Sequence, residues 1–161
     1  MKEIIHLYSG YDLWANTRMV ERLQRESDTV LDHPARSSFP SLRLTARHMR
    51  DAGIIWYQRL SGMPVTLSGK QDEGIGSLLE QSAAMNEMVL GLDEQRLLER
   101  VDYTNLKGDP FTQPRWQLLM HIFNHATYHR GQLITIMHQL GLDEVPNTDM
   151  VNYQRSLLAG A

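Results

Sequence analysis

The stretch HIFNHATYHRGQ, residues 121–132, places histidines at positions 121, 125 and 129, at intervals of four residues. On an α-helix, residues four apart lie one turn above each other, with Cβ atoms roughly 5–6 Å apart. Two imidazoles at this spacing can share one metal ion at nitrogen distances of about 2.0–2.1 Å. The outer two histidines are two turns apart, roughly 12 Å at a rise of about 1.5 Å per residue. One helix therefore supplies two ligands, and either His121 with His125 or His125 with His129 fits the spacing.

The residues that flank this stretch predict a long helix. Pro114 stands in its first turn, where the missing N–H costs little, and Gly141 ends the helix after Leu140. A zinc-protease helix would carry glutamate directly after the first histidine of the pair, as the base that acts on metal-bound water. Ala126 occupies that place here, so the sequence does not support this type of proteolysis.

Apolar residues at helical spacing predict three further helices. Ser41 follows a proline and is a suitable N-cap for the second of them. Ser77 and Glu80 have the spacing of a capping box, which opens the third. The predicted helices cover about residues 2–25, 41–60, 77–91 and 114–140.

Pro114 lies in the first turn of the fourth helix, and the other five prolines of the chain lie outside the predicted helices. Residues 26–40 are expected to form a loop, residues 101–114 a short hairpin or irregular excursion, and residues 149–158 a short final helix. The predicted fold class is all-α: a four-helix bundle with a short hairpin-like excursion before the fourth helix and a short C-terminal helix. The length of 161 residues suits one domain with a single core, spanning residues 1–161.

Composition excludes several classes of function. The formal net charge is -3 with no clustered Lys/Arg stripe, so nucleic acid is a poor partner. Glu3, His6 and Asp12 interrupt the N-terminus, which therefore does not resemble a signal peptide, and no stretch approaches the roughly 18 apolar residues of a membrane span. We expect a cytoplasmic protein. The chain has no cysteine, so a transition-metal site must use imidazole and carboxylate.

A third metal ligand has to come from another helix. His48 is the best candidate, because it is the one histidine within a long apolar-periodic helix apart from the fourth helix and the start of the first. The alternative is an ordinary, partly exposed histidine within the polar stretch ARHMRD. Spacing alone does not separate these two interpretations.

Three stretches carry a family resemblance: YDLWANTRMV, LTARHMRDAGIIWYQRLSG and HIFNHATYHRGQLITIMHQLG. Together they resemble the DinB-like family of metal-dependent enzymes and proteins of unassigned activity, over nearly the whole chain, and NHATYHRGQ is the most specific part. The resemblance implies a four-helix bundle, commonly a homodimer, that binds a divalent metal such as zinc or nickel. The ligands that it implies here are His48, His125 and His129, with His121 as a neighbour of the site.

Other side chains are expected to orient the imidazoles or to line the pocket. The candidates for orienting the ligands by proximity are Asp12, Asn16, Asp51 and Asn124. Tyr8 is a candidate for the pocket wall, although aromatic residues at helical spacing are more often plain core. Arg130 adjoins a ligand but points about 100° away, where we expect a salt bridge.

Three imidazoles leave a coordination position open, as in catalytic rather than structural metal sites. The resemblance extends to transferases that use low-molecular-weight thiols, and a thiol at such a metal is deprotonated. The predicted function is therefore a thiol-dependent S-transferase that acts on a small electrophilic substrate. The alternatives are a metal-dependent hydrolase and a non-catalytic, stress-related bundle that binds metal or ligand.

Overall fold

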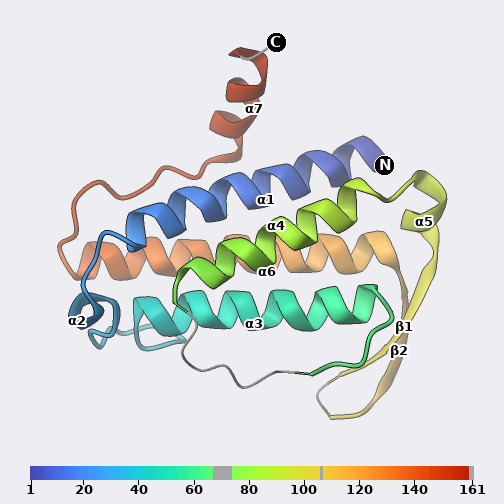
Figure 1. The fold of residues 1–161 in the computed structure, drawn as a ribbon, viewed down its shortest axis with the longest axis horizontal. Helices are drawn as coiled ribbons and strands as arrows, with labels where there is room; N and C mark the ends of the chain where they lie inside the picture. Colours follow the sequence, from blue (N-terminus) through green and yellow to red (C-terminus); the bar gives the residue numbers. More distant parts are fainter. Residues whose placement is uncertain (67–73, 106, 160–161) are drawn as a thin grey trace.

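The computed structural model describes residues 1–66, 74–105 and 107–159, and four long helices form the body of this part of the chain (Figure 1). They are α1 (Lys2–Leu23), α3 (Leu42–Leu60), α4 (Gly76–Leu90) and α6 (Arg115–Gln139). Helices α1 and α3 each pack against both α4 and α6, so the four surround a common interior. The predicted all-α bundle is confirmed.

The shorter elements lie at the periphery of the bundle. They are α2 (Asp28–Leu31), α5 (Glu94–Leu98), β1 (Arg100–Thr104), β2 (Pro110–Pro114) and α7 (Met150–Ala159). Strands β1 and β2 pair antiparallel, with Arg100 opposite Pro114, which confirms the predicted hairpin. Helix α7, the predicted final helix, stands away from the bundle (Figure 1). Its contact with α1 is made by Tyr153, whose hydroxyl lies where a side chain on Gly10 would be.

None of the helices in the described part of the chain is both long enough and apolar enough to cross a membrane.

Two short helices were not predicted, because a single turn shows no apolar periodicity. Residues 26–40 were expected to be a loop, but Ser27 caps one helical turn there by accepting a hydrogen bond from the Val30 N–H at 3.4 Å. Asp93 caps α5 in the same way, at 2.8 Å from the Arg96 N–H. In both cases a short polar side chain satisfies a free N–H of the first turn.

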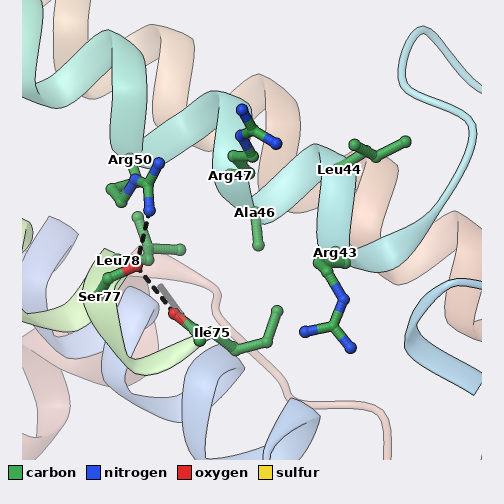
Figure 2. Close-up of a pocket in the computed structure, with 9 residues that line it drawn as sticks. Arg43, Leu44, Ala46, Arg47, Arg50, Ile75, Ser77 and Leu78 are labelled. Carbon is green, nitrogen blue, oxygen red and sulfur yellow. Dashed lines mark hydrogen bonds between the residues drawn. The ribbon is translucent and has the colours of Figure 1, made fainter. Parts of the chain in front are cut away.

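The predicted N-cap of α3 is confirmed, whereas the predicted N-cap of α4, Ser77, is wrong. The Ser41 hydroxyl accepts from the Leu44 N–H at 3.1 Å, as an N-cap should. Helix α4 begins at Gly76, however, so Ser77 lies inside its first turn and cannot cap it. Its hydroxyl instead donates to the Gly74 carbonyl at 2.8 Å and accepts from Arg50 at 3.3 Å (Figure 2). This hydroxyl thus joins α3 to the start of α4.

The apolar interior is divided into two clusters, one at each end of the bundle. One contains Met19, Val20, Leu23, Leu42, Ala46, Met49, Leu133, Ile136 and Met137, among others. The other contains Ile5, Leu60, Met85, Val89, Leu97, Leu118, Leu119, Ile122 and Phe123, among others. On α1 and α4, buried polar residues separate the members of the two clusters: Asp12 and Asn16 on α1, and Ser82 on α4.

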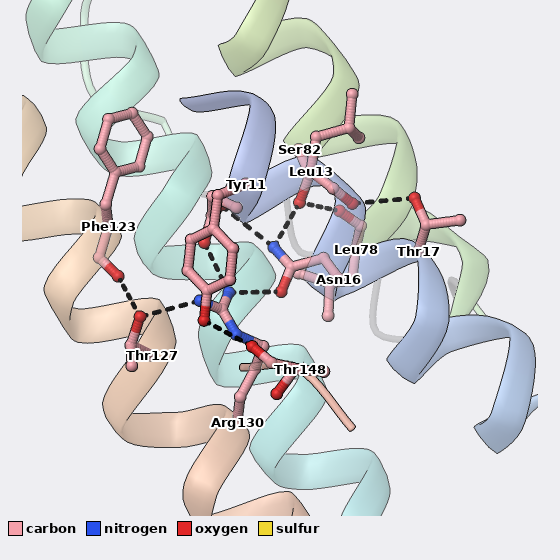
Figure 3. Close-up of polar contacts among 11 residues, drawn as sticks. Tyr11, Leu13, Asn16, Thr17, Leu78, Ser82, Phe123, Thr127, Arg130 and Thr148 are labelled. Carbon is pink, nitrogen blue, oxygen red and sulfur yellow. Dashed lines mark hydrogen bonds and ion pairs between the residues drawn. The ribbon is translucent and has the colours of Figure 1, made fainter. Parts of the chain in front are cut away.

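Arg130 of α6 completes this polar layer and is 1% exposed. Its Nη1 atom donates to Asp12 Oδ1 at 2.5 Å and to Asn16 Oδ1 at 2.9 Å (Figure 3). The Asn16 amide in turn donates to the Ser82 hydroxyl at 2.9 Å. The salt bridge expected for Arg130 is therefore present, with Asp12 as its partner. The layer ties α1, α4 and α6 together at one level of the bundle.

Candidate metal centre

Three histidines from two helices converge on one point. His48 lies in the second turn of α3, and His125 and His129 lie one turn apart on α6. The Nε2 atom of His125 is 3.1 Å from Nε2 of His48 and 3.1 Å from Nε2 of His129. Among the described residues, no further His, Asp or Glu joins this group. The structure thus assembles the three histidines that the family resemblance implied.

The separation of these nitrogens suits a metal ion. Ligand nitrogens about 2.0–2.1 Å from a tetrahedral ion lie roughly 3.3–3.4 Å from one another. The two measured separations of 3.1 Å are within a few tenths of an ångström of that value. Small adjustments of the side chains would complete the geometry.

A glutamine fixes the protonation of His129. The Nδ1 atom of His129 lies 2.7 Å from Oε1 of Gln132, and an amide oxygen accepts hydrogen bonds only, so Nδ1 carries the proton. The other end of the amide donates to the Ser38 hydroxyl at 2.9 Å. In the neutral ring, the lone pair is then on Nε2, which faces His125.

The nitrogens at the centre cannot all be satisfied by hydrogen bonds among themselves. A proton on His125 Nε2 can point straight at one of its two neighbours, which leaves the other neighbour without a well-aligned hydrogen bond. A cation at the centre would bind to all three lone pairs at once. The arrangement therefore fits a bound metal better than a hydrogen-bonded polar seam.

The electrostatics of the centre keep the imidazoles neutral. Burial lowers the pKa of His125 to about 4, and the neighbouring histidines, His129, His48 and His121, contribute to the shift. Burial also lowers the pKa of His48, with a further contribution from His129 and an opposing one from Asp51. Burial also lowers the pKa of His129, and the hydrogen bond that His129 donates to Gln132 acts in the opposite direction. Neutral imidazole is the form that binds a metal ion.

The metal-free protein should lose stability as the solution is acidified from about pH 6.5 to about pH 4. In this window His125 binds a proton in the unfolded chain, whereas in the folded chain, where its pKa is about 4, it does not. Because the unfolded state binds more protons, the free energy of unfolding falls as the pH falls. Urea denaturation of the metal-free protein across this range measures the slope. The His125→Gln variant is the comparison, and an equal slope in both proteins would contradict the assignment.

Aromatic rings enclose one side of the centre. Phe39, in the segment before α3, stacks on His48 with ring centroids 4.0 Å apart and lies 5.6 Å from His129. Tyr128 meets His129 edge-on at 5.0 Å and remains 60% exposed. Sequence patterns did not reveal Phe39, because a residue in an irregular segment has no periodicity to follow. Gln132 could have been found, since it lies three residues after His129 on the same face of the helix.

His121 lies beside the centre but outside the cluster of three. Its ring centroid is 6.1 Å from that of His125, and its ring meets Trp56 edge-on at 5.2 Å. The side chain is exposed. This places His121 at the edge of the site, on the side opposite Phe39 and Tyr128 along α6.

Two further candidates, Asn16 and Tyr8, lie in the interior of the bundle. Asn16 belongs to the buried polar layer, and together with His125 it lines a small cavity of about 10 Å³. Tyr8 stacks on Phe123 at 5.6 Å and meets Tyr11 edge-on, so its ring contacts lie within the core.

None of the remaining candidates, Asp51, Asp12 and Asn124, forms a hydrogen bond to one of the three histidines in the described part of the chain. Asp51 forms ion pairs with Arg47 and Arg50, and it acts on His48 through its charge. Asp12 is paired with Arg130, and Asn124 is exposed. The residue that directly orients a ligand is Gln132.

Replacing Gln132 by leucine should weaken metal binding about 10- to 100-fold, the range typical of residues that hold a metal ligand in place. Without the amide oxygen, the His129 ring loses the contact that fixes its proton on Nδ1. Competition with a zinc-binding dye measures the affinity. Gln139→Leu, at an exposed position near the end of α6, is the matched control and should leave the affinity unchanged.

Comparisons with known proteins identify the family of this chain. A model of the DinB family matches residues 1–157. The chain is also similar to Protein DinB of Bacillus subtilis (strain 168), with 25% identity over 150 residues that cover 84% of this chain and 86% of that protein. Because the family model spans nearly the entire sequence, including both helices that carry the three histidines, the chain belongs to the DinB family.

Proposed function

We propose that this protein is a metal-dependent transferase that joins a low-molecular-weight thiol to a small electrophile. The observation that carries the proposal is the convergence of three imidazole nitrogens, with no fourth acidic or histidine ligand among the described residues. A divalent ion such as zinc or nickel held by these nitrogens would offer an open position at which a thiol loses its proton.

The chain supplies no sulfur nucleophile of its own, because it contains no cysteine. The thiol must therefore enter as a substrate. In the transfer, its sulfur forms a bond to the electrophilic carbon, the leaving group departs with the electron pair of the broken bond, and the thiol proton is released. We propose that His121, which is exposed and one turn from His125, takes up that proton.

The surroundings of the centre support a reaction rather than storage of a metal. Phe39 and Tyr128 cover the rings of His48 and His129, which limits the approach of water from that side. Gln132 holds His129 in one protonation state, so the ligand does not have to rearrange during a turnover cycle. The rings of His121 and Trp56 meet edge-on beside the centre, at 5.2 Å.

The test begins with elemental analysis of tag-free protein beside its His48→Ala variant. The metal-loaded protein is then assayed with monochlorobimane as the electrophile and L-cysteine as the thiol, above the uncatalysed rate. Turnover that needs both metal and thiol supports the proposal. Hydrolysis of p-nitrophenyl acetate without thiol would instead indicate a hydrolase, and bound metal without either activity would indicate a binding protein.

A further inference from the structure

A groove of about 460 Å³ lies between the end of α3 and the hairpin, away from the three histidines. The hairpin runs beside that end of α3 (Figure 1). Its lining includes Arg59, Met63, Val65, Asp102, Tyr103 and Phe111. Its volume is within the range of about 300–1,000 Å³ that is usual for sites that bind small molecules.

Arg59 is a cation without an acidic partner in the part of the chain that the structure describes. Its guanidinium lies over the rings of Trp56 and Tyr103, at 4.7 and 5.4 Å from their centroids. Its Nη2 atom donates to the Thr104 carbonyl at 2.6 Å, whereas its Nε atom is buried and has no hydrogen-bond acceptor. The covered Nε atom is out of reach of a ligand, but Arg59 lines the groove, so a carboxylate that enters it would gain a charge-assisted hydrogen bond from an Nη atom.

Part of the groove lining is apolar. Met63, Val65 and Phe111 are 44%, 46% and 45% exposed, although each is a large hydrophobic residue. They come from two separate elements and face one groove, which is what a site for an apolar group requires. Asp102 is the one acid among the lining residues, and its carboxylate accepts a hydrogen bond from the Thr112 hydroxyl at 2.6 Å.

We propose that this groove binds a small amphiphilic carboxylic acid. The carboxylate lies against the Arg59 guanidinium, and the hydrocarbon part covers Met63, Val65 and Phe111. The proposal does not depend on the thiol chemistry of the metal centre. The Trp56 ring lies between the groove residue Tyr103 and His121 at the edge of the centre, meeting both edge-on, at 5.3 and 5.2 Å.

Calorimetric titration of the intact protein with hexanoate tests the proposal, with hexanamide as the uncharged ligand of equal length. Hexanoate should bind about tenfold more tightly or better, the factor that corresponds to one charge-assisted hydrogen bond. The methyl resonance of Met63 should shift during the titration, because this side chain lines the groove. Equal affinity for the acid and the amide, or no binding of hexanoate, would overturn the proposal.

Variants locate the site. Arg59→Met keeps the aliphatic stem over Trp56 but removes the charge, and should abolish the preference for hexanoate over hexanamide. Arg18→Met is the matched control, since Arg18 also lies over a tryptophan ring, at 5.1 Å from the Trp14 centroid, but lines a different pocket. Asp102→Asn should tighten hexanoate binding by removal of a like charge. Loss of hexanoate binding in the Arg18 variant, or retention of the preference in a folded Arg59 variant, contradicts the assignment.

Discussion

His125→Ala is expected to reduce the metal content of the purified protein from about one equivalent to background. The Nε2 atom of His125 is the central one of the cluster, 3.1 Å from each of the other two. Its removal leaves two imidazoles, from different helices, with no nitrogen between them. We expect the affinity for zinc to fall by more than about 100-fold, because even residues that only orient a ligand contribute 10- to 100-fold.

The measurement is elemental analysis of protein without a polyhistidine tag, followed by titration with zinc. His121→Ala is the matched control, since it removes an imidazole one turn away on the same helix that is exposed and outside the cluster. We expect it to weaken binding only modestly. Equal loss of metal from the His121, His125 and His129 variants would mean that the ligand assignment is wrong.

Arg130→Met is expected to lower the free energy of unfolding by about 3–5 kcal/mol, the cost of breaking a buried ion pair by removing one partner. Arg130 is 1% exposed and donates to Asp12, Asn16 and Thr127. Burial raises the pKa of the Asp12 carboxyl, and Arg130 acts in the opposite direction. Without Arg130, Asp12 keeps one hydrogen bond, from the Asn16 amide at 3.2 Å, but has no cation beside its buried carboxylate, and the Asn16 oxygen loses its donor.

Urea denaturation of the metal-free proteins measures this effect apart from metal binding. The double variant Asp12→Leu/Arg130→Met should recover a large part of the lost stability, because no unpaired charge then remains in the interior. Arg100→Met, at an exposed position on β1, is the control and should change stability by less than about 0.5 kcal/mol. A single Arg130 variant as stable as this control would show that the polar layer does not depend on the pair.

The helices could be predicted from the sequence because the residues that begin and end them act locally. Ser41 after a proline set the start of α3, and Gly141 set the end of α6 with a φ of +67°, a conformation that favours glycine. The ligand set was harder to predict, since spacing alone allowed either His121 or His129 to pair with His125. The packing of α3 against α6 places His48 next to His125 and His129, and spacing on one helix cannot reveal such an arrangement.

The remaining features depend on contacts between segments that are distant in the sequence. Phe39 reaches His48 only because its segment folds back over the start of α3 and the end of α6. Ser77 has the spacing of a capping box, yet its hydroxyl accepts a hydrogen bond from Arg50 of α3. Helix α4 begins at Gly76, one residue before Ser77. From the sequence, Asp12 and Asn16 were candidates for orienting the metal ligands. In the structure, both accept hydrogen bonds from Arg130.

The buried polar layer also determines how the helices are aligned along their axes. Apolar side chains are largely interchangeable, so a bundle with a uniform core could slide by one helical turn, about 5.4 Å, at moderate cost. Such a slide of α1 past α6 would carry Asp12 and Asn16 away from Arg130 and bury an isolated charge among hydrocarbons. Because α6 also bears His125 and His129, the pairing that selects one alignment of the helices also sets the height of these two imidazoles relative to α1.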